Sequence, residues 1–257
     1  MTLQTSNGVR PDKGGPRCHV VTPHHTPTSP IPTNIGAVTM VTQPSRLVLA
    51  LSDDDPSMRL RAALAAGSQP DPALLEPLVE RCGVEPDFHV RDTLSWALTM
   101  LPRELTLPRI GRELHADGLQ ARTQALHTLS KIADPATWTW IPRHTLHDAD
   151  DELARTAWRA AVAVVPRDQR TELAADLSTE FGRGDRGLRW ALTRALLALD
   201  DAALPVVESE QARLAASVEP DDPALLHARA TRHLLVDPDL GFDEAERRAS
   251  DPQLGGQ

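Results

Sequence analysis

The sequence predicts an all-α protein, organised as a right-handed α-solenoid of five to six helical hairpins. Three observations predict this fold. Alanine and leucine, the best helix formers, are abundant in the 257-residue chain, which has 3 Phe, 5 Trp and no Tyr. Most of the 22 prolines fall near the N-terminus or at expected helix boundaries, where proline is tolerated. A segment that begins with aspartate and carries arginine four residues later recurs along the chain.

The clearest copy of the repeated segment is DFHVRDTLSWAL, residues 87–98. Its arginine recurs at intervals of 32, 31, 33 and 34 residues, at Arg59, Arg91, Arg122, Arg155 and Arg189. His227 takes the place of the arginine in a degenerate sixth copy. A helix–turn–helix unit repeated at this spacing is typical of an α-solenoid, in which each unit buries its apolar face against its neighbours.

The helices are expected in pairs, because helix starts and helix breaks alternate along each repeat. Aspartate followed by proline opens helices at Asp55, Asp71 and Asp134, since aspartate caps a helix and proline suits its first turn. The six pairs are expected over residues 46–51 and 56–66, 73–82 and 87–101, 107–116 and 119–133, 138–147 and 151–165, 167–181 and 185–199, and 202–217 and 223–236. A last short helix is expected over residues 242–249.

The chain is expected to divide into three parts. Residues 1–45 are rich in proline and threonine and predict a disordered leader, because they offer no core to bury. Met40 lies just before the first expected helix and is an alternative start of translation. The solenoid is expected over residues 46–250, followed by a flexible tail over residues 251–257.

Charge and cysteine content restrict the class of protein. The formal charge is −9, and residues 1–45 hold three basic residues and one acidic residue, so the remaining chain carries −11. An acidic body argues against nucleic acid as a partner, although a local basic groove stays open as an alternative. Cys18 and Cys82 fit no metal-binding spacing and form no disulfide framework. With no apolar run of membrane-spanning length and no secretory signal, a soluble cytoplasmic protein without a membrane partner is expected.

The repeated pattern Asp-x-x-(Val/Met/Leu/Ala)-Arg-x-x-(Ala/Leu/Trp) resembles a HEAT repeat, of the short bacterial kind also found in phycobilin-lyase-like proteins. The resemblance covers residues 46–236. Residues 87–101 and 124–132 are similar to HEAT segments of actinobacterial proteins, some of them fused behind a MerR-type winged helix, which residues 1–45 do not resemble. The resemblance implies an armadillo-like stack whose second helices line a concave face, and a scaffold that binds another protein.

Each position of the repeat is expected to have its own role. The aspartate caps the second helix and the arginine pairs with it on the same face, as in Asp87 with Arg91. Gly118 stands in the place of the aspartate in the third repeat and predicts a weaker cap. Positions three and seven after the arginine predict the buried stripe of the helix: Ala62 and Ala66, Leu94 and Leu98, Ala125 and Leu129, Trp158 and Val162, Leu192 and Leu196, and Ala230 and Leu234.

Positions one and five after the arginine are expected to face the concave side. They read Asp92 and Trp96, Thr123 and His127, Thr156 and Ala160, Trp190 and Arg194, and Ala228 and Arg232, with Arg159 adjacent. Tryptophan beside arginine is typical of protein interfaces. We therefore hypothesise a protein-binding surface formed by Asp92, Trp96, His127, Arg159, Trp190 and Arg194. In the alternative interpretation, the tryptophans pack against the next repeat and the arginines pair with the many acidic residues.

The sequence predicts no catalytic residues, no cofactor and no metal site. It contains no phosphate loop, nucleophile elbow or CxxC motif, and no His-Glu dipeptide of the kind that HEAT-type di-iron hydroxylases use. His144 and His147, with Asp148 and Asp150 beyond them, weakly suggest a metal site, but the aspartates are better explained as a turn and a helix cap. We therefore predict a non-enzymatic protein-binding scaffold. The alternative is a nucleic-acid-associated transcriptional regulator or DNA-repair-type protein that uses Arg159, Arg194 and Arg232.

Overall fold

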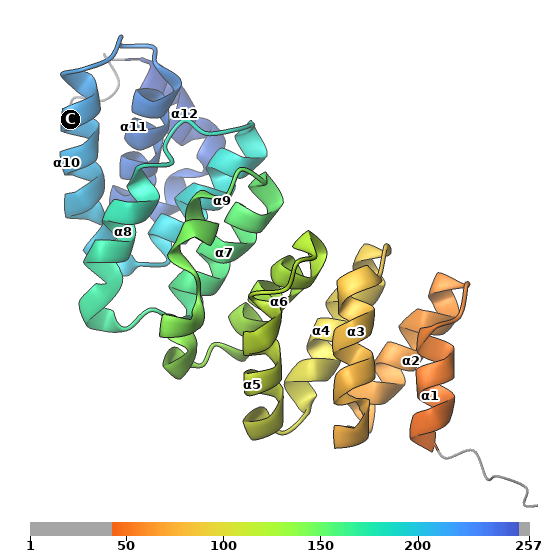
Figure 1. Cartoon of the computed structure of the whole chain (residues 1–257). Coiled ribbons are helices and arrows are strands. Elements are labelled where there is room, and N and C mark those ends of the chain that lie inside the picture. Colours follow the sequence, from red (N-terminus) through yellow and green to blue (C-terminus); the bar gives the residue numbers. More distant parts are fainter. Residues whose placement is uncertain (1–42, 252–257) are drawn as a thin grey trace, which may run out of the picture. The chain divides into compact units, whose positions relative to one another are not determined.

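The computed structural model describes residues 43–251, and this part of the chain is all-helical, without a strand (Figure 1). The α-helices are α1 (Gln43–Leu51), α2 (Pro56–Ser68), α3 (Leu75–Val84), α4 (Phe88–Met100), α5 (Arg103–Glu113), α6 (Leu119–Ile132), α7 (Asp151–Val164), α8 (Arg170–Ser178), α9 (Arg186–Leu197), α10 (Ala203–Ala215), α11 (Pro223–Val236) and α12 (Phe242–Ser250). Short 3₁₀ helices lie at η1 (Pro72–Leu74), η2 (Pro135–Trp140), η3 (Arg143–His147), η4 (Arg167–Gln169), η5 (Asp200–Ala202) and η6 (Pro238–Leu240). The all-α prediction is therefore confirmed for the described residues.

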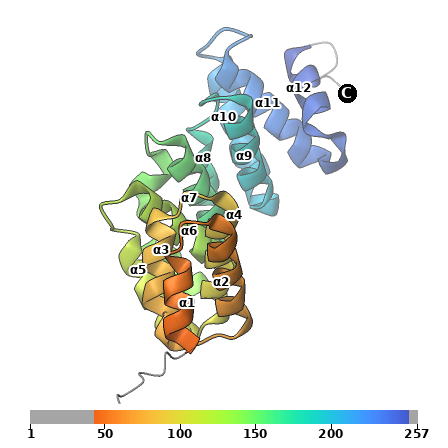
Figure 2. The ribbon, with the colours of Figure 1, turned by 90° about the vertical axis from the view of Figure 1, so that its right-hand side faces the viewer.

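Each helix packs mainly against its neighbours in the chain and in the adjoining repeat. The second helices of successive pairs contact one another in the order α2, α4, α6, α7, α9 and α11 (Figures 1 and 2). Among the first helices, α1 contacts α3 and α8 contacts α10. One continuous hydrophobic core extends from Leu51 to Ala228, and a smaller cluster lies between α11 and α12.

Aspartate caps fix where most of the second helices begin. The carboxylates of Asp55, Asp87 and Asp185 accept hydrogen bonds from backbone N–H groups of the first turn, which have no partner within the helix. Gly118 precedes α6 without any side-chain cap, as the sequence predicts. Asp222 caps α11 and is followed by Pro223 at its first position.

Two expectations about the fourth repeat are wrong. Residues 138–147 do not form one helix, because Pro142 separates two 3₁₀ helices, η2 and η3. Asp150 caps α7, as expected, and its carboxylate accepts from the N–H of Leu153 at 2.9 Å. The repeat register of α7 is therefore shifted by one residue, so that Ala154, and not Arg155, occupies the place of Arg91.

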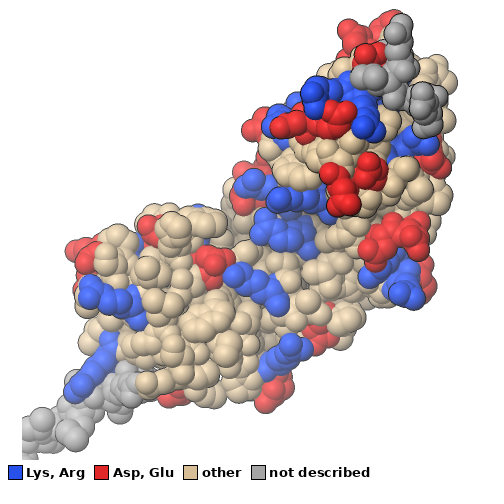
Figure 3. Space-filling view, turned by 180° about the vertical axis from the view of Figure 1, so that it is seen from behind, with Lys and Arg blue, Asp and Glu red and all other residues tan. Residues whose placement is uncertain are grey.

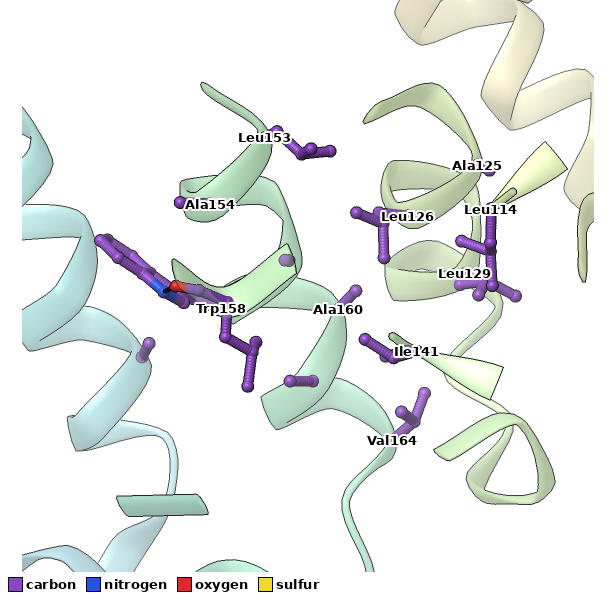
Figure 4. Close-up of a cluster of buried hydrophobic side chains, with 14 of the residues drawn as sticks. Leu114, Ala125, Leu126, Leu129, Ile141, Leu153, Ala154, Trp158, Ala160 and Val164 are labelled. Atoms are coloured by element: carbon purple, nitrogen blue, oxygen red, sulfur yellow. Dashed lines mark hydrogen bonds between the residues drawn. The ribbon is translucent and has the colours of Figure 1, made fainter. Parts of the chain in front are cut away.

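The shifted register explains which side chains of α7 are buried. The predicted stripe is buried in α2, α4, α6, α9 and α11, but in α7 Val162 is only half-buried. Ala157 and Ala161, three and seven residues after Ala154, are fully buried instead. Trp158 is core as predicted, with 1% of its surface exposed, and its indole N–H donates to the Leu146 carbonyl at 2.8 Å (Figure 4).

Several predictions concern residues outside the described range of 43–251. Cys18, the predicted leader and the alternative start at Met40 lie there, as does most of the predicted tail. Cys82 is described, and it is buried and free, as expected of a small core residue. Burial raises the pKa of its thiol to about 12.

Candidate binding grooves on the second-helix face

The repeated arginines bind backbone carbonyls and do not pair with the capping aspartates. Arg91 donates from one guanidinium nitrogen to the carbonyls of Glu85 and Pro86, in the loop before its helix, at 2.9 and 2.7 Å. Arg59, Arg122 and Arg189 make the same kind of contact with the loops before α2, α6 and α9. The expected aspartate–arginine pairs are wrong because the carboxylates are engaged with helix N–H groups. We call Arg59, Arg91, Arg122 and Arg189 the loop-binding arginines.

The fourth repeat has no loop-binding arginine of its own. Ala154 occupies that place, and Arg183 of the following repeat donates to the Asp148 carbonyl and to the Asp151 carboxylate instead. Arg155 lies one position further round α7, where it pairs with Glu152. Its Nε is buried and has no hydrogen-bond partner among the described residues. The shift of register thus moves Arg155 onto the open side of α7.

Two grooves follow this open side. The α4–α7 groove, about 540 Å³, is lined by side chains of α4, α6 and α7 and by Asp150. The α7–α9 groove, about 630 Å³, is lined by side chains of α7 and α9. Arg155 and Arg159 line both, so the two grooves adjoin along α7. Figure 3, which views the molecule from behind, shows Lys and Arg side chains gathered near the middle of this side.

Five of the six residues of the hypothesised surface line these grooves. Asp92, His127 and Arg159 line the α4–α7 groove, and Arg159 also lines the α7–α9 groove with Trp190 and Arg194. His127 Nε2 lies 3.1 Å from the Asp92 carboxylate, and Arg159 lies 3.4 Å from His127 Nδ1. The structure therefore brings together side chains from four successive second helices.

Trp96 is not part of either groove. It packs on α2, where a Cβ added to Gly67 would lie 2.2 Å from its ring. This contact matches the alternative interpretation, in which a tryptophan packs against a neighbouring repeat, although the neighbour is the preceding one. Thr156 and Ala160, which were also expected on the concave side, are buried, as Thr123 of α6 is, although Thr123 and Thr156 line the floor of the α4–α7 groove. Arg155 takes their place, and an aspartate cap at position 150 is the sequence signal that identifies it.

Four arginines line the two grooves: Arg91, which binds its loop, and Arg155, Arg159 and Arg194. Burial lowers the pKa of Arg159, and the nearby charges of Arg155 and Arg194 lower it further. Neither Arg159 nor Arg194 pairs with a carboxylate of residues 43–251, whereas Arg232 pairs with Glu208 at 3.1 Å. The nucleic-acid alternative relies on Arg159, Arg194 and Arg232. Among residues 43–251, the first two therefore have no carboxylate partner and the third has one.

At the α4 side of the α4–α7 groove, the charges of Asp92 and Lys131 neutralise one another. Burial opposes the charged form of Asp92, but hydrogen bonds with Lys131 and His127 lower its pKa. Lys131 Nζ lies 2.9 Å from that carboxylate. Burial lowers the pKa of His127, and the charges of Lys131 and Arg159 add to this effect against the influence of Asp92. A neutral His127 therefore separates the paired Asp92 from the arginines of α7.

Aromatic and apolar side chains border both grooves. Trp190 stacks on Phe242 of α12 with ring centroids 4.4 Å apart, and the Arg194 guanidinium lies 5.0 Å from the Trp190 ring. Phe88 and Leu119 line the α4–α7 groove and are 67% and 40% exposed. Sequence reasoning did not single out Phe88 or Leu119, because they precede the repeated arginine positions and carry no periodic signal.

Comparisons with known proteins add little to this geometry. No family model matches the chain, and no curated protein matches it. The chain is similar to the crystal structure of an engineered protein, at 17% sequence identity over 84% of this chain and 98% of that one, with a TM-score of 0.45.

His144 and His147, and the lengths of the helices, bear on metal binding and on membrane crossing. His147 lies between two carboxylates, 2.9 Å from Asp176 and 2.6 Å from Glu180, and His144 belongs to the same 3₁₀ helix, η3. Among the described residues, no group of three or more His, Cys, Asp or Glu side chains is arranged to hold a metal ion. None of the described helices has both the length and the apolar character needed to cross a membrane.

Proposed function

We propose that this chain is a HEAT-type α-solenoid that binds a segment of another protein along its second helices and has no catalytic activity. The observation that carries this proposal is the adjoining pair of grooves. They extend over α4, α6, α7 and α9, and they are open at the surface, whereas the opposite edges of the same helices are packed in the core. Such a surface offers many shallow contacts to a partner and no enclosed site for a reaction.

The repeat interval and the packing order support the solenoid part of the proposal. Second helices contact second helices at a spacing of about one repeat, and several polar contacts have the same spacing. Ser95, for example, interacts with Thr128, and Thr193 with His227 and Thr231. Stacking of this kind gives each repeat the apolar cover that it lacks alone.

Site-specific photo-crosslinking in the native cell tests the proposal. A photoreactive amino acid is placed at Glu152 or Ala198, which line the two grooves, or at the exposed control positions Glu104 and Asp168 of α5 and η4. We expect a discrete adduct with another polypeptide from the groove positions alone. Adducts of equal yield from the control positions, or none from the grooves, would contradict the proposal.

A further inference from the structure

We propose that the segment held in these grooves is an acidic peptide with a bulky apolar residue. Its carboxylates would lie against Arg155, Arg159 and Arg194, and its apolar side chain against Phe88 and Leu119. This inference rests on the proposed function, since it names the kind of protein segment that the grooves bind.

Acidic residues outnumber lysines and arginines in the chain, and this excess is the first observation that supports the proposal. The chain has 36 acidic residues and 27 lysines and arginines, so carboxylates are plentiful. On other surfaces, several arginines are paired with two carboxylates each: Arg143 contacts Glu172 and Asp176, and Arg186 contacts Asp243 and Glu246. Arg159 and Arg194 have no such partner in residues 43–251, although they lie close enough to repel each other.

A carboxylate from a partner would relieve this repulsion. Arginine binds carboxylates through two parallel N–H···O bonds, and such charge-assisted bonds are about twice as strong as neutral ones. Arg155 lines both grooves beside Arg159 and pairs with the exposed Glu152 of its own helix. Arg159 of α7 and Arg194 of α9, with Arg155 beside them, therefore provide a site for acidic side chains of a partner.

The other lining residues favour a peptide over a nucleic acid. Asp92, Asp150 and Glu152 line the α4–α7 groove beside the arginines. A continuous phosphate backbone would pass these carboxylates and be repelled, whereas a peptide carries its charges at separate positions. The exposed Phe88 and Leu119 lie on the same groove and would cover an apolar side chain of the peptide.

A display experiment tests the inference. The full chain is used to select from a library of random peptides of about 12 residues, and selected peptides are then titrated by fluorescence polarisation. We expect enrichment of Asp and Glu together with Leu, Phe or Trp. The double variant Arg159→Gln/Arg194→Gln should bind the selected peptides at least tenfold more weakly. The control Arg103→Gln/Arg167→Gln removes the same charge from exposed positions outside both grooves and should change affinity less than twofold.

Further measurements separate this inference from the proposed function. Thermal melting confirms that each variant is folded, and Arg159→Lys/Arg194→Lys keeps the charge as a second variant, with an intermediate affinity expected. The variant Ala198→Trp fills the α7–α9 groove. Peptides that lose affinity for it but bind the Arg→Gln variant normally would overturn the acidic-peptide inference and leave groove binding intact. Peptides insensitive to both changes, or no selected peptides, would overturn both proposals, and displacement of the peptide by duplex DNA would overturn the peptide inference.

Discussion

The repeats around α4, α6 and α9 differ from the repeat around α7 by one residue in register. In the former, the arginine four residues after the N-cap binds the preceding loop, and Arg122 donates to the carbonyls of Ala116 and Asp117 in this way. In the latter, the cap moves to Asp150, the loop-binding place falls to Ala154, and Arg155 lies in the grooves. The same side chain in the same sequence pattern thus stabilises a loop in one repeat and faces an open groove in the next.

A helical repeat can thus place an arginine at an open groove without losing its architecture. Arg183 replaces the missing arginine by reaching the Asp148 carbonyl from the following repeat. The loop therefore keeps a guanidinium partner, and α7 gains two adjacent cations, Arg155 and Arg159, on one side. A rotation of about 100° per residue is enough for this exchange of roles.

The largest loss in the free energy of unfolding is expected for a substitution on the buried side of α7. Trp158→Ala should lower the free energy of unfolding by about 3–5 kcal/mol, since it leaves a large cavity and removes the hydrogen bond to Leu146. Val162→Ala should cost below about 1 kcal/mol, because the shifted register leaves Val162 half-buried beside a groove. Urea denaturation measures both. Equal losses in the free energy of unfolding for the two variants would indicate that α7 keeps the unshifted register.

The loop-binding arginine of α2 has the most buried ion pair. Arg59 donates to Glu85 at 2.7 and 2.8 Å, and the Glu85 side chain is fully buried. Arg59→Met should cost about 3–5 kcal/mol, because it leaves a buried carboxylate with only part of its partners. Burial alone would raise the pKa of Glu85, but hydrogen bonds from Arg59, the Asp87 N–H and Arg81 lower it to about 2.

This pKa gives a pH dependence with a defined sign. Since the folded-state pKa of Glu85 lies below its ordinary value of 4.5, its stabilising contribution is complete above that value and is lost as the pH falls toward 2. Stability curves between about pH 5 and pH 2 should therefore be steeper for the wild type than for Glu85→Gln. Parallel curves for the two proteins would show that Glu85 does not contribute this dependence.

The position of the cap separates the two registers of α7 with a smaller effect. Asp150→Ala should cost about 1 kcal/mol, because the N–H of Leu153 loses its acceptor. Asp151→Ala removes only a partly exposed pair with Arg183 and should cost about 0.5 kcal/mol or less. A larger loss at Asp151 than at Asp150 in thermal melts would mean that the helix starts one residue later.

The smallest expected effect is a gain at the uncapped helix α6. Gly118 has an ordinary φ of −71°, and a Cβ there would meet only Ala121 at 3.8 Å. Gly118→Asp should stabilise the protein by a few tenths of a kcal/mol, because it supplies the cap that the other repeats have. Gly118→Ala is the control and should give no gain.

The helices and the core were largely predictable from the sequence, because Asp, Pro and the apolar stripe act locally. Asp222-Pro223 marks the start of α11, and Leu94 and Leu98 are buried as their spacing predicts. The register of α7 was not predicted, because the spacing of the repeated arginines places Arg155, and not Ala154, in the repeat position. The cap at Asp150 and the burial of Ala157 and Ala161 show the shifted register.

The grooves were predictable in part, for a different reason. Asp92, His127, Arg159, Trp190 and Arg194 follow from the repeat position. The packing of Trp96 depends on Gly67 in another repeat, where the missing side chain makes room for the ring. The stacking of Trp190 on Phe242 depends on α12, which lies outside the repeat pattern. Contacts between distant segments of this kind have no signal in local periodicity.

The central claim is that Arg122 stabilises its loop, whereas Arg155 lies in the grooves, paired only with the exposed Glu152, and makes no bond to a loop. The most direct measurement compares the free energies of unfolding of Arg122→Gln and Arg155→Gln with that of the wild type in urea. We predict a loss of about 1.5–3 kcal/mol for Arg122→Gln, which abolishes two bonds to carbonyls. For Arg155→Gln we predict a change within about 0.5 kcal/mol. Equal losses in the two variants would contradict the claim.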